Sequence, residues 1–325
     1  MGETIPPKNY RPFYRLSKLA SIADNPMPIK RITQTLTVLV MTGLVSVACK
    51  AQPLDELEDG SMPPVEFRAD SKVKAIIMTG TGMENKYLGR AGQGMAVRDK
   101  IMYRLYDTGL CQTFDLSDLA NPKKIASFEL GSHGSINHAN CAQTCLDENG
   151  DVLLYVSGQK EGKTYVERVT STGSTLIQTI TLSAMDLLDQ TIILNAVCGD
   201  DGYLWYFGAG GSKLLFAKAR KPLMEEGDVT ITEDDILDFW SEDGYVYEED
   251  VWQGGMVYNN LLFMLFGSTG AKAHLAVYDV RAHQRIMDIS LSSAVKEEPE
   301  DCEIIPEGIL VATYGGSHYY LIRPE

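Results

Sequence analysis

The sequence predicts an all-β fold built from five units of similar design. From residue 73 onward, short runs rich in Val, Ile, Leu, Tyr and Phe alternate with Gly, Asn and Asp turns, and helical periodicity is almost absent. A polar residue recurs shortly before the first hairpin turn of each unit, and the last unit is one strand short. These observations predict a five-bladed β-propeller, and the alternative is six blades, with one hidden in residues 182–250.

The recurring polar residues set the length of each unit. They are separated by 47, 55, 58 and 48 residues, which leaves room for four strands and is close to the length of propeller blades. The first strand of each blade lines the central channel of a propeller. We therefore expect five side chains to gather around one axis: Gln93, Asn140, Asn195, Gln253 and Asp301.

Four strands are expected in the first, second and fourth units. In the first unit they cover 94–97, 101–106, 110–116 and 125–130, with a two-residue turn at Asp99-Lys100. In the second they cover 140–146, 152–157, 163–169 and 176–182. In the fourth they cover 254–258, 261–266, 274–280 and 285–291, with a turn at Asn259-Asn260.

The third and fifth units are less regular. Strands are expected at 196–198, 203–207 and 214–219, but the acidic stretch 224–243 obscures the fourth, and we expect a helical turn at 236–240. The fifth unit has strands at 302–305, 309–313 and 317–322. We expect the lone strand 73–78 to pair with this last blade, because that closes the ring and removes an exposed edge.

The N-terminal region predicts export. Lys30 and Arg31 precede an apolar run of thirteen residues (36–48), too short for a transmembrane helix and followed by Cys49. We interpret 1–26 as a misplaced start or a disordered extension, 27–49 as a signal peptide, 50–70 as an acidic flexible tether and 71–325 as the propeller. Ala48 before Cys49 resembles a bacterial lipoprotein processing site, which makes Cys49 the lipidated residue. Ser46 stands where Leu is usual, so secretion without a lipid is the alternative.

Charge and cysteine content narrow the class of protein. The formal net charge is −15, and residues 50–325 alone carry −19, so a nucleic-acid or anionic-membrane partner is not expected. Membrane contact is expected only through the lipid. Four cysteines fall on predicted inner strands, where we expect reduced, apolar core residues: Cys141, Cys145, Cys198 and Cys302.

The expected ring of polar side chains is the candidate ligand site. It also includes His138, as a packed histidine or as a general base or ligand contact, and Glu300, which precedes Asp301. Carboxylate and amide oxygens are ligands that Ca²⁺ prefers, so Glu300 and Asp301 are the candidate metal ligands. The structural interpretation is that these groups hold the inner strands together through hydrogen bonds.

Three short motifs carry a family resemblance. Gln-Gly-Met at 93–95, His-Ala-Asn at 138–140 and Glu-Pro-Glu-Asp at 298–301 resemble inner-strand motifs of secreted bacterial and phage-associated propellers related to helveticin J and to a teichoic-acid-associated protein. Ala139 and Asp301 stand where that group has glycines. The resemblance covers 80–325 and implies a cell-surface binding protein more than a defined catalyst.

The sequence favours a binding protein over an enzyme. It has no P-loop, no nucleophile elbow and no His-Glu-x-x-His motif. The prediction is a monomeric, lipid-anchored propeller of the cell envelope that binds a glycan or an envelope protein. The alternative is a hydrolase or lyase acting on carbohydrate or phosphoester at the same channel face, with or without Ca²⁺.

Overall fold

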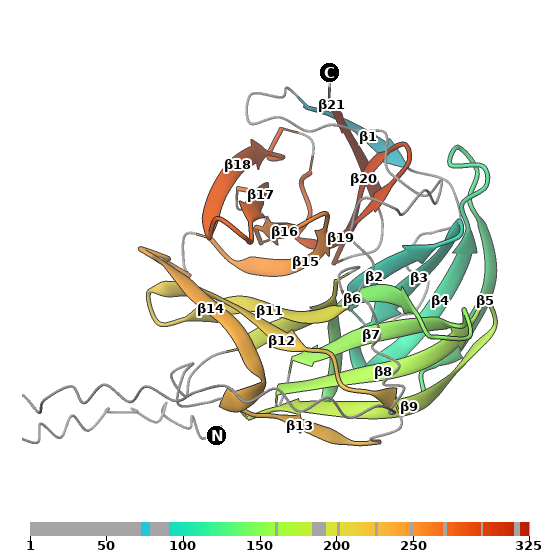
Figure 1. Ribbon diagram of the computed structural model, residues 1–325. Helices are drawn as coiled ribbons and strands as arrows, with labels where there is room; N and C mark the ends of the chain where they lie inside the picture. Colours follow the sequence, from blue (N-terminus) through green and yellow to red (C-terminus); the bar gives the residue numbers. More distant parts are fainter. Residues whose placement is uncertain are drawn as a thin grey trace, which may run out of the picture. The chain divides into compact units, whose positions relative to one another are not determined.

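The computed structural model describes residues 73–78, 91–159, 162–183, 193–199, 202–224, 227–247, 250–268, 272–293, 295–314 and 319–324. Five sheets form a five-bladed β-propeller (Figure 1), which confirms the predicted fold class. The signal peptide, Cys49 and the tether lie outside the described residues. Within the described ranges, no helix is long and apolar enough to cross a membrane.

In each blade four strands pair in antiparallel order, and the first strand is innermost except in blade 5, where β19 (Pro299–Ile305) is innermost and the N-terminal β1 (Val73–Met78) is outermost. Blade 1 contains β2 (Gly92–Arg98), β3 (Ile101–Tyr106), β4 (Leu110–Asp115) and β5 (Lys123–Glu129). Blade 2 contains β6 (Asn137–Leu146), β7 (Val152–Gln159), β8 (Lys163–Thr170) and β9 (Gly173–Leu182). Blade 3 contains β10 (Ile193–Cys198), β11 (Tyr203–Gly210), β12 (Lys213–Arg220) and β14 (Ile236–Asp243).

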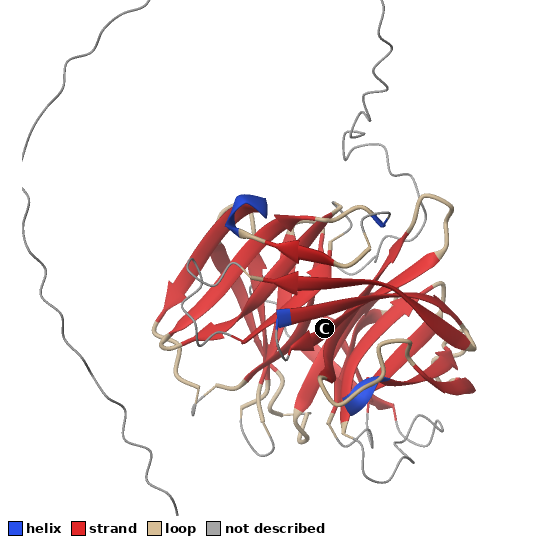
Figure 2. Ribbon diagram, turned by 90° about the horizontal axis from the view of Figure 1, so that it is seen from below, coloured by secondary structure: helices blue, strands red, loops and turns tan. Residues whose placement is uncertain are grey.

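Blade 4 contains β15 (Trp252–Tyr258), β16 (Leu261–Phe266), β17 (His274–Asp279) and β18 (Gln284–Ser290). Blade 5 contains β19 (Pro299–Ile305), β20 (Gly308–Thr313) and β21 (Tyr319–Pro324), completed by the N-terminal β1 (Val73–Met78). β1 pairs with β21 from Val73↔Pro324 to Met78↔Tyr319. The predicted closure of the ring by the N-terminal strand is confirmed. Figure 2 shows that the described residues consist mainly of strands.

The acidic stretch of blade 3 differs from the prediction. Residues 236–240 belong to strand β14, and a short 3₁₀ turn (η5, Glu233–Asp235) precedes it. Trp240 pairs with Phe216 of β12 and stacks on its ring with centroids 3.8 Å apart, so cross-strand packing outweighs the local helical pattern. The same stretch supplies β13 (Val229–Ile231), which adds to blade 2 in parallel with β9. Because 203–243 builds blade 3, the six-bladed alternative is wrong.

The hydrophobic core lies between the blades. Five clusters of buried apolar side chains fill the five spaces between neighbouring blades. In the cluster between blades 2 and 3, Cys145 of β6 forms a disulfide with Cys198 of β10, with Cα atoms 6.5 Å apart. The expectation that these two cysteines are reduced is therefore wrong. It failed because the two inner strands run side by side, which the sequence separation of 53 between the two cysteines conceals.

The first hairpins of blades 1 and 4 have the predicted turns. Both residues of each turn have positive φ, 48° and 64° at Asp99 and Lys100, and 49° and 60° at Asn259 and Asn260. This is the type I′ geometry whose twist matches that of paired strands. These turns position the inner strands so that their opposite ends meet at the axis.

Candidate functional site: the channel rim

The inner strands are irregular at the positions that the sequence singles out. In β2 the residues Gln93 and Gly94 oppose Leu105 alone, and in β15 the pair Gln253 and Gly254 opposes Leu265 alone. β6 carries a larger bulge over 138–140, and Glu300 is the extra residue of β19. Bulges redirect side chains and are frequent beside functional sites. The end of the inner strands where they lie is called the channel rim, and its residues are Gln93, His138, Asn140, Asn195, Gln253, Glu298 and Glu300.

Asp301 is the carboxylate that joins the blades. Its Oδ2 accepts the backbone N–H of Met95 (2.8 Å) from blade 1 and that of Ala142 (3.0 Å) from blade 2. Its Oδ1 accepts the N–H of Cys302 (2.9 Å) and lies 3.5 Å from the thiol of Cys141. Burial raises the pKa of Asp301 to about 8, against the N–H bonds that favour the charged form. A side chain of blade 5 thus holds the inner strands of blades 1 and 2.

The layer around Asp301 also contains contacts from blade 2 to blade 4, which are not neighbours. Gln143 of β6 donates through Nε2 to the carbonyl of Val257 (2.8 Å) and accepts the N–H of Val257 (3.3 Å). Cys141 contacts the backbone of Gly255, with its thiol 3.0 Å from the carbonyl oxygen. At Gly254, an added Cβ would collide with the Asp301 carboxylate. These contacts agree with the interpretation that polar groups hold the inner strands together through hydrogen bonds, because they fill the axis at this level.

Three amides and a carboxylate form a chain along the rim. Asn140 Nδ2 donates to Asn195 Oδ1 (3.2 Å), and Asn195 Nδ2 donates to the carbonyl of Gln253 (3.3 Å). Gln253 Nε2 donates to Glu298 Oε1 (2.9 Å) and to the carbonyl of Gly267 (3.0 Å). The structure therefore brings the predicted ring members of blades 2, 3 and 4 together, as the repeat implied.

Glu300 and Gln93 do not take part in this series of hydrogen bonds, because their side-chain oxygens accept none from the described residues. Each is 3% exposed. The oxygen Gln93 Oε1 is buried and has no partner among the described residues, and within the same ranges Glu300 makes no hydrogen bond or ion pair. Burial, followed by the nearby Glu298, raises the pKa of the Glu300 carboxyl well above its usual value. A buried polar group without a partner is costly, so the Gln93 oxygen requires an ordered water or a bound molecule to complete it.

Arg104 of β3 supports this corner of the rim. Its guanidinium is fully buried between Tyr106 and Tyr319, 5.7 and 5.8 Å from their ring centroids. Nη1 donates to the carbonyl of Gln93, and Nη2 donates to that of Thr313 (2.7 Å). Sequence reasoning missed Arg104, although a single Arg within the apolar strand IMYRLY is a detectable signal.

His138 lies at the edge of the rim. Its Nδ1 is 3.0 Å from Asp107 Oδ1, and the two side chains are 28% and 36% exposed. The neighbouring Asn137 Oδ1 accepts the N–H of Ala139, whose φ of 52° marks the centre of the bulge. His138 is thus hydrogen-bonded and partly accessible, which combines the two interpretations drawn from the sequence.

The geometry bears on the calcium prediction. Both Asp301 oxygens already accept backbone N–H groups, so an ion bound there would compete with these hydrogen bonds. Among the residues that the structure describes, no cluster of three or more His, Cys, Asp or Glu side chains is arranged to hold a metal ion. Of the two predicted ligands, Glu300 is the one whose oxygens are uncommitted.

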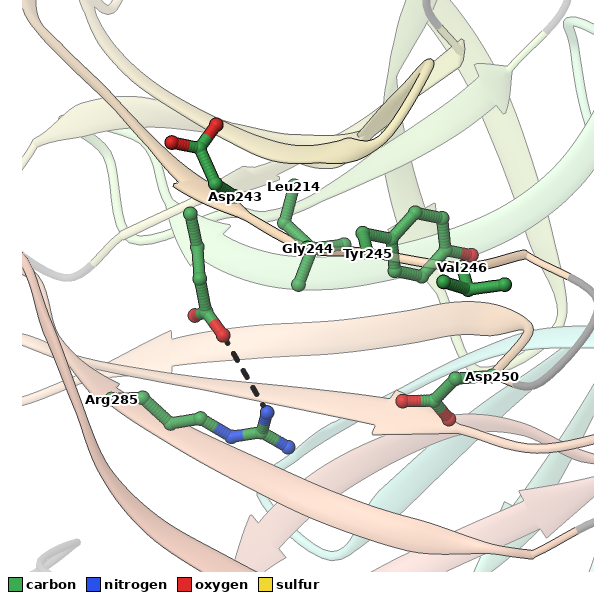
Figure 3. Close-up of a pocket in the computed structure, with 8 residues that line it drawn as sticks. Leu214, Asp243, Gly244, Tyr245, Val246, Asp250 and Arg285 are labelled. Carbon is green, nitrogen blue, oxygen red and sulfur yellow. Dashed lines mark ion pairs between the residues drawn. The ribbon is translucent and has the colours of Figure 1, made fainter.

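A second candidate is the cleft between blades 3 and 4 (Figure 3). It has a volume of about 160 Å³, and Arg285 points toward Glu242 across it, with an N–O distance of 3.6 Å. Its charged groups are already paired: Asp250 with His274 (2.8 Å) and Asp243 with Lys213 (3.1 Å). Arg285 Nε is buried there without a partner among the described residues, but the same guanidinium already pairs with Glu242 and Asp288. Because the charged groups of the cleft are held by one another, we assign the functional site to the rim.

Comparison with known proteins concerns the fold. No family model matches the sequence, and no curated protein matches it. Solved structures of similar shape include the tail fiber of Staphylococcus aureus phage P68 (14% identity, 77% of this chain, 52% of that chain, TM-score 0.48). An exo-β-1,3-galactanase from Phanerochaete chrysosporium (10% identity, 77% and 64%, TM-score 0.47) and one from Clostridium thermocellum (13%, 77% and 62%, TM-score 0.44) are also similar. The chain spans about half to two thirds of these proteins, and likeness at this level does not bear on activity.

Proposed function

We propose that the protein is an exported, lipid-anchored β-propeller that binds a polar ligand at the channel rim. The observation that carries the proposal is the buried oxygen Gln93 Oε1, which has no partner among the described residues. The buried Glu300 carboxyl, which makes no side-chain hydrogen bond within the same residues, adds to it. A folded protein seldom leaves such groups unpaired unless a ligand or an ordered water completes them.

The composition of the rim favours binding over catalysis. Its carboxyl groups, Glu298 and Glu300, both come from the segment that leads into and begins β19, whereas blades 1 to 4 contribute amides and one histidine. Amides hydrogen-bond a ligand but do not exchange protons with it during a reaction. Asp301, the third carboxylate of this segment, is occupied in holding blades 1 and 2.

A hydrolase acting on carbohydrate or phosphoester is the second candidate function. It is favoured by one observation, the raised pKa of the Glu300 carboxyl beside Glu298. A carboxyl that keeps its proton beside a second carboxyl is the arrangement that a general acid requires. In that case Glu300 donates the proton to the leaving group.

Two features support export. The basic pair, apolar run and Cys49 of the N-terminal region have the pattern of a lipoprotein signal. The Cys145–Cys198 disulfide supports it independently, because disulfides persist mainly in oxidising compartments. Kinship with the helveticin J and teichoic-acid-associated propellers is part of this proposal and agrees with a surface location.

Glu300→Gln separates the two functions. The protein and the variant are titrated with a panel of glycans and phosphoesters, and both are assayed for turnover of every compound. A binding protein turns over none of the panel, and its affinity falls in the variant. A hydrolase loses about 10²-fold or more of its turnover in the variant while still binding substrate, since the proton donor is gone; that result would replace the binding proposal.

Lipid anchoring is tested on the intact chain in a bacterial host. Labelling with a radioactive or clickable fatty acid should mark the wild type and not Cys49→Ala, and the wild type should fractionate with membranes. An unlabelled protein in the culture medium would support secretion without a lipid instead, and a cytoplasmic protein would contradict export.

A further inference from the structure

The unused groups of the rim identify the chemistry of the ligand. Gln93 Oε1 can only accept a hydrogen bond, and Glu300 supplies carboxyl oxygens. Glu298 adds a third acceptor group, although one of its oxygens already accepts from Gln253. A rim with this excess of acceptors matches a molecule that presents several hydroxyl or amine donors.

The charge at the rim disfavours an anionic ligand. Glu298 lies there, and residues 50–325 carry a net charge of −19. The nearest cation, Arg104, is fully buried, with Nη1 and Nη2 committed to the carbonyls of Gln93 and Thr313. A phosphate or carboxylate would therefore meet repulsion without an accessible cation to offset it.

The backbone of an aromatic residue is hydrogen-bonded to both segments that carry these acceptors. Tyr314 follows β20, and its N–H donates to the carbonyl of Glu298 (2.9 Å) while its own carbonyl accepts the N–H of Gly92 (3.0 Å). The residue is therefore tied on one side to the strand that carries Gln93 and on the other to the segment that carries Glu300. It is 48% exposed, which gives it a solvent-facing surface where most rim side chains are buried.

We propose that the rim binds an uncharged carbohydrate, whose hydroxyl groups donate to Gln93 and Glu300 and whose apolar ring face packs on Tyr314. The inference rests on the proposed binding function and names its ligand class. A sugar supplies the clustered donors that the two acceptors lack and carries no charge that Glu298 would repel. Its C–H face is the surface that an exposed tyrosine ring accommodates.

The test is calorimetric titration of the intact protein with three probes: neutral oligosaccharides of glucose, galactose, mannose and N-acetylglucosamine; oligomers of glycerol phosphate; and CaCl₂. We expect binding of a neutral oligosaccharide. In Tyr314→Ala its Kd should rise about tenfold, and in Tyr314→Phe it should stay within about twofold, because the phenyl ring still packs on the sugar. Glu300→Gln should raise Kd about tenfold, since the amide presents two N–H donors where the carboxyl presents at most one.

The control is Leu146→Ala, which shortens an exposed side chain (46%) at the far end of inner strand β6 and should leave Kd unchanged. Thermal midpoints of all variants verify folding. Binding of glycerol phosphate oligomers or Ca²⁺ alone, weakened by Glu300→Gln, would overturn the carbohydrate inference and leave a binding rim in place. If a probe bound with the same Kd to the wild type and to every rim variant, or if no probe bound at all, the proposed function would be overturned as well.

Discussion

Replacing Asp301 by Asn tests whether this carboxylate holds the blades together. The amide keeps one oxygen, so it can occupy the place of Oδ2 and accept from Met95 and Ala142, or that of Oδ1 and accept from Cys302. In the better orientation the NH₂ group faces the N–H of Cys302, and one buried donor loses its partner. An unpaired buried N–H costs about 1–3 kcal/mol, so we predict a loss of about 2 kcal/mol in the free energy of unfolding.

Glu300→Gln is the matched control for that experiment. Glu300 is the adjacent carboxyl and is buried to a similar degree, but it accepts no N–H from the described residues. We expect its variant to unfold within about 0.5 kcal/mol of the wild type, since the substitution leaves no N–H of the described residues without its acceptor. Equilibrium unfolding in urea at pH 9, above the pKa of about 8 of Asp301, measures both. Equal stabilities for Asp301→Asn and the wild type would refute the role assigned to Asp301.

Three further perturbations follow from the described contacts. Lys100→Gly should stabilise the protein by about 1 kcal/mol in urea unfolding, because Lys100 is exposed and has a φ of 64°, which glycine adopts without strain. Replacing Cys145 and Cys198 together by Ser should cost about 4 kcal/mol, from the loop of 53 residues that the disulfide closes, and be seen as a lower thermal midpoint. Burial acts to lower the pKa of His274, but hydrogen bonds to two aspartates outweigh it and raise the pKa to about 9. His274 therefore contributes stability that is fully present below pH 6.5 and is lost as pH rises to 9. Thermal midpoints across that range measure the loss.

Each of these has a contradicting result. A less stable Lys100→Gly would mean that the turn does not adopt the type I′ conformation. If the thermal midpoint of the wild type did not change on adding a reductant, the disulfide would be contradicted. For His274, the reference is His274→Gln, whose midpoint should vary less over pH 6.5–9; an identical pH profile would show that the imidazole charge does not stabilise the fold.

The repeat made much of the fold predictable. The turns at Asp99-Lys100 and Asn259-Asn260 belong to the sequence classes that form type I′ hairpins, and polar residues at regular spacing placed the inner strands. β14 was missed because its acidic residues conceal the alternation around Trp240, which depends on stacking with Phe216.

The sequence predicted where the site lies, but it did not predict which of its residues hold the blades together and which leave their oxygens open. Asp301 and Glu300 are adjacent in sequence, yet one accepts N–H groups from residues 206 and 159 positions away and the other accepts none within the described ranges. That division depends on the bulge at Glu300, which no local pattern encodes. Arg104 escaped notice because the carbonyls that it binds have no sequence signature.

The central claim is that Asp301 is a structural link and that the rim above it binds a sugar. A crystal structure of the protein soaked in CaCl₂ together with the tightest-binding neutral oligosaccharide tests both parts in one measurement. We predict a sugar ring on Tyr314 with hydroxyls at Gln93 and Glu300, and Asp301 still accepting the N–H groups of two other blades. A cation at about 2.3–2.6 Å from the Asp301 oxygens, with no sugar at the rim, would contradict it.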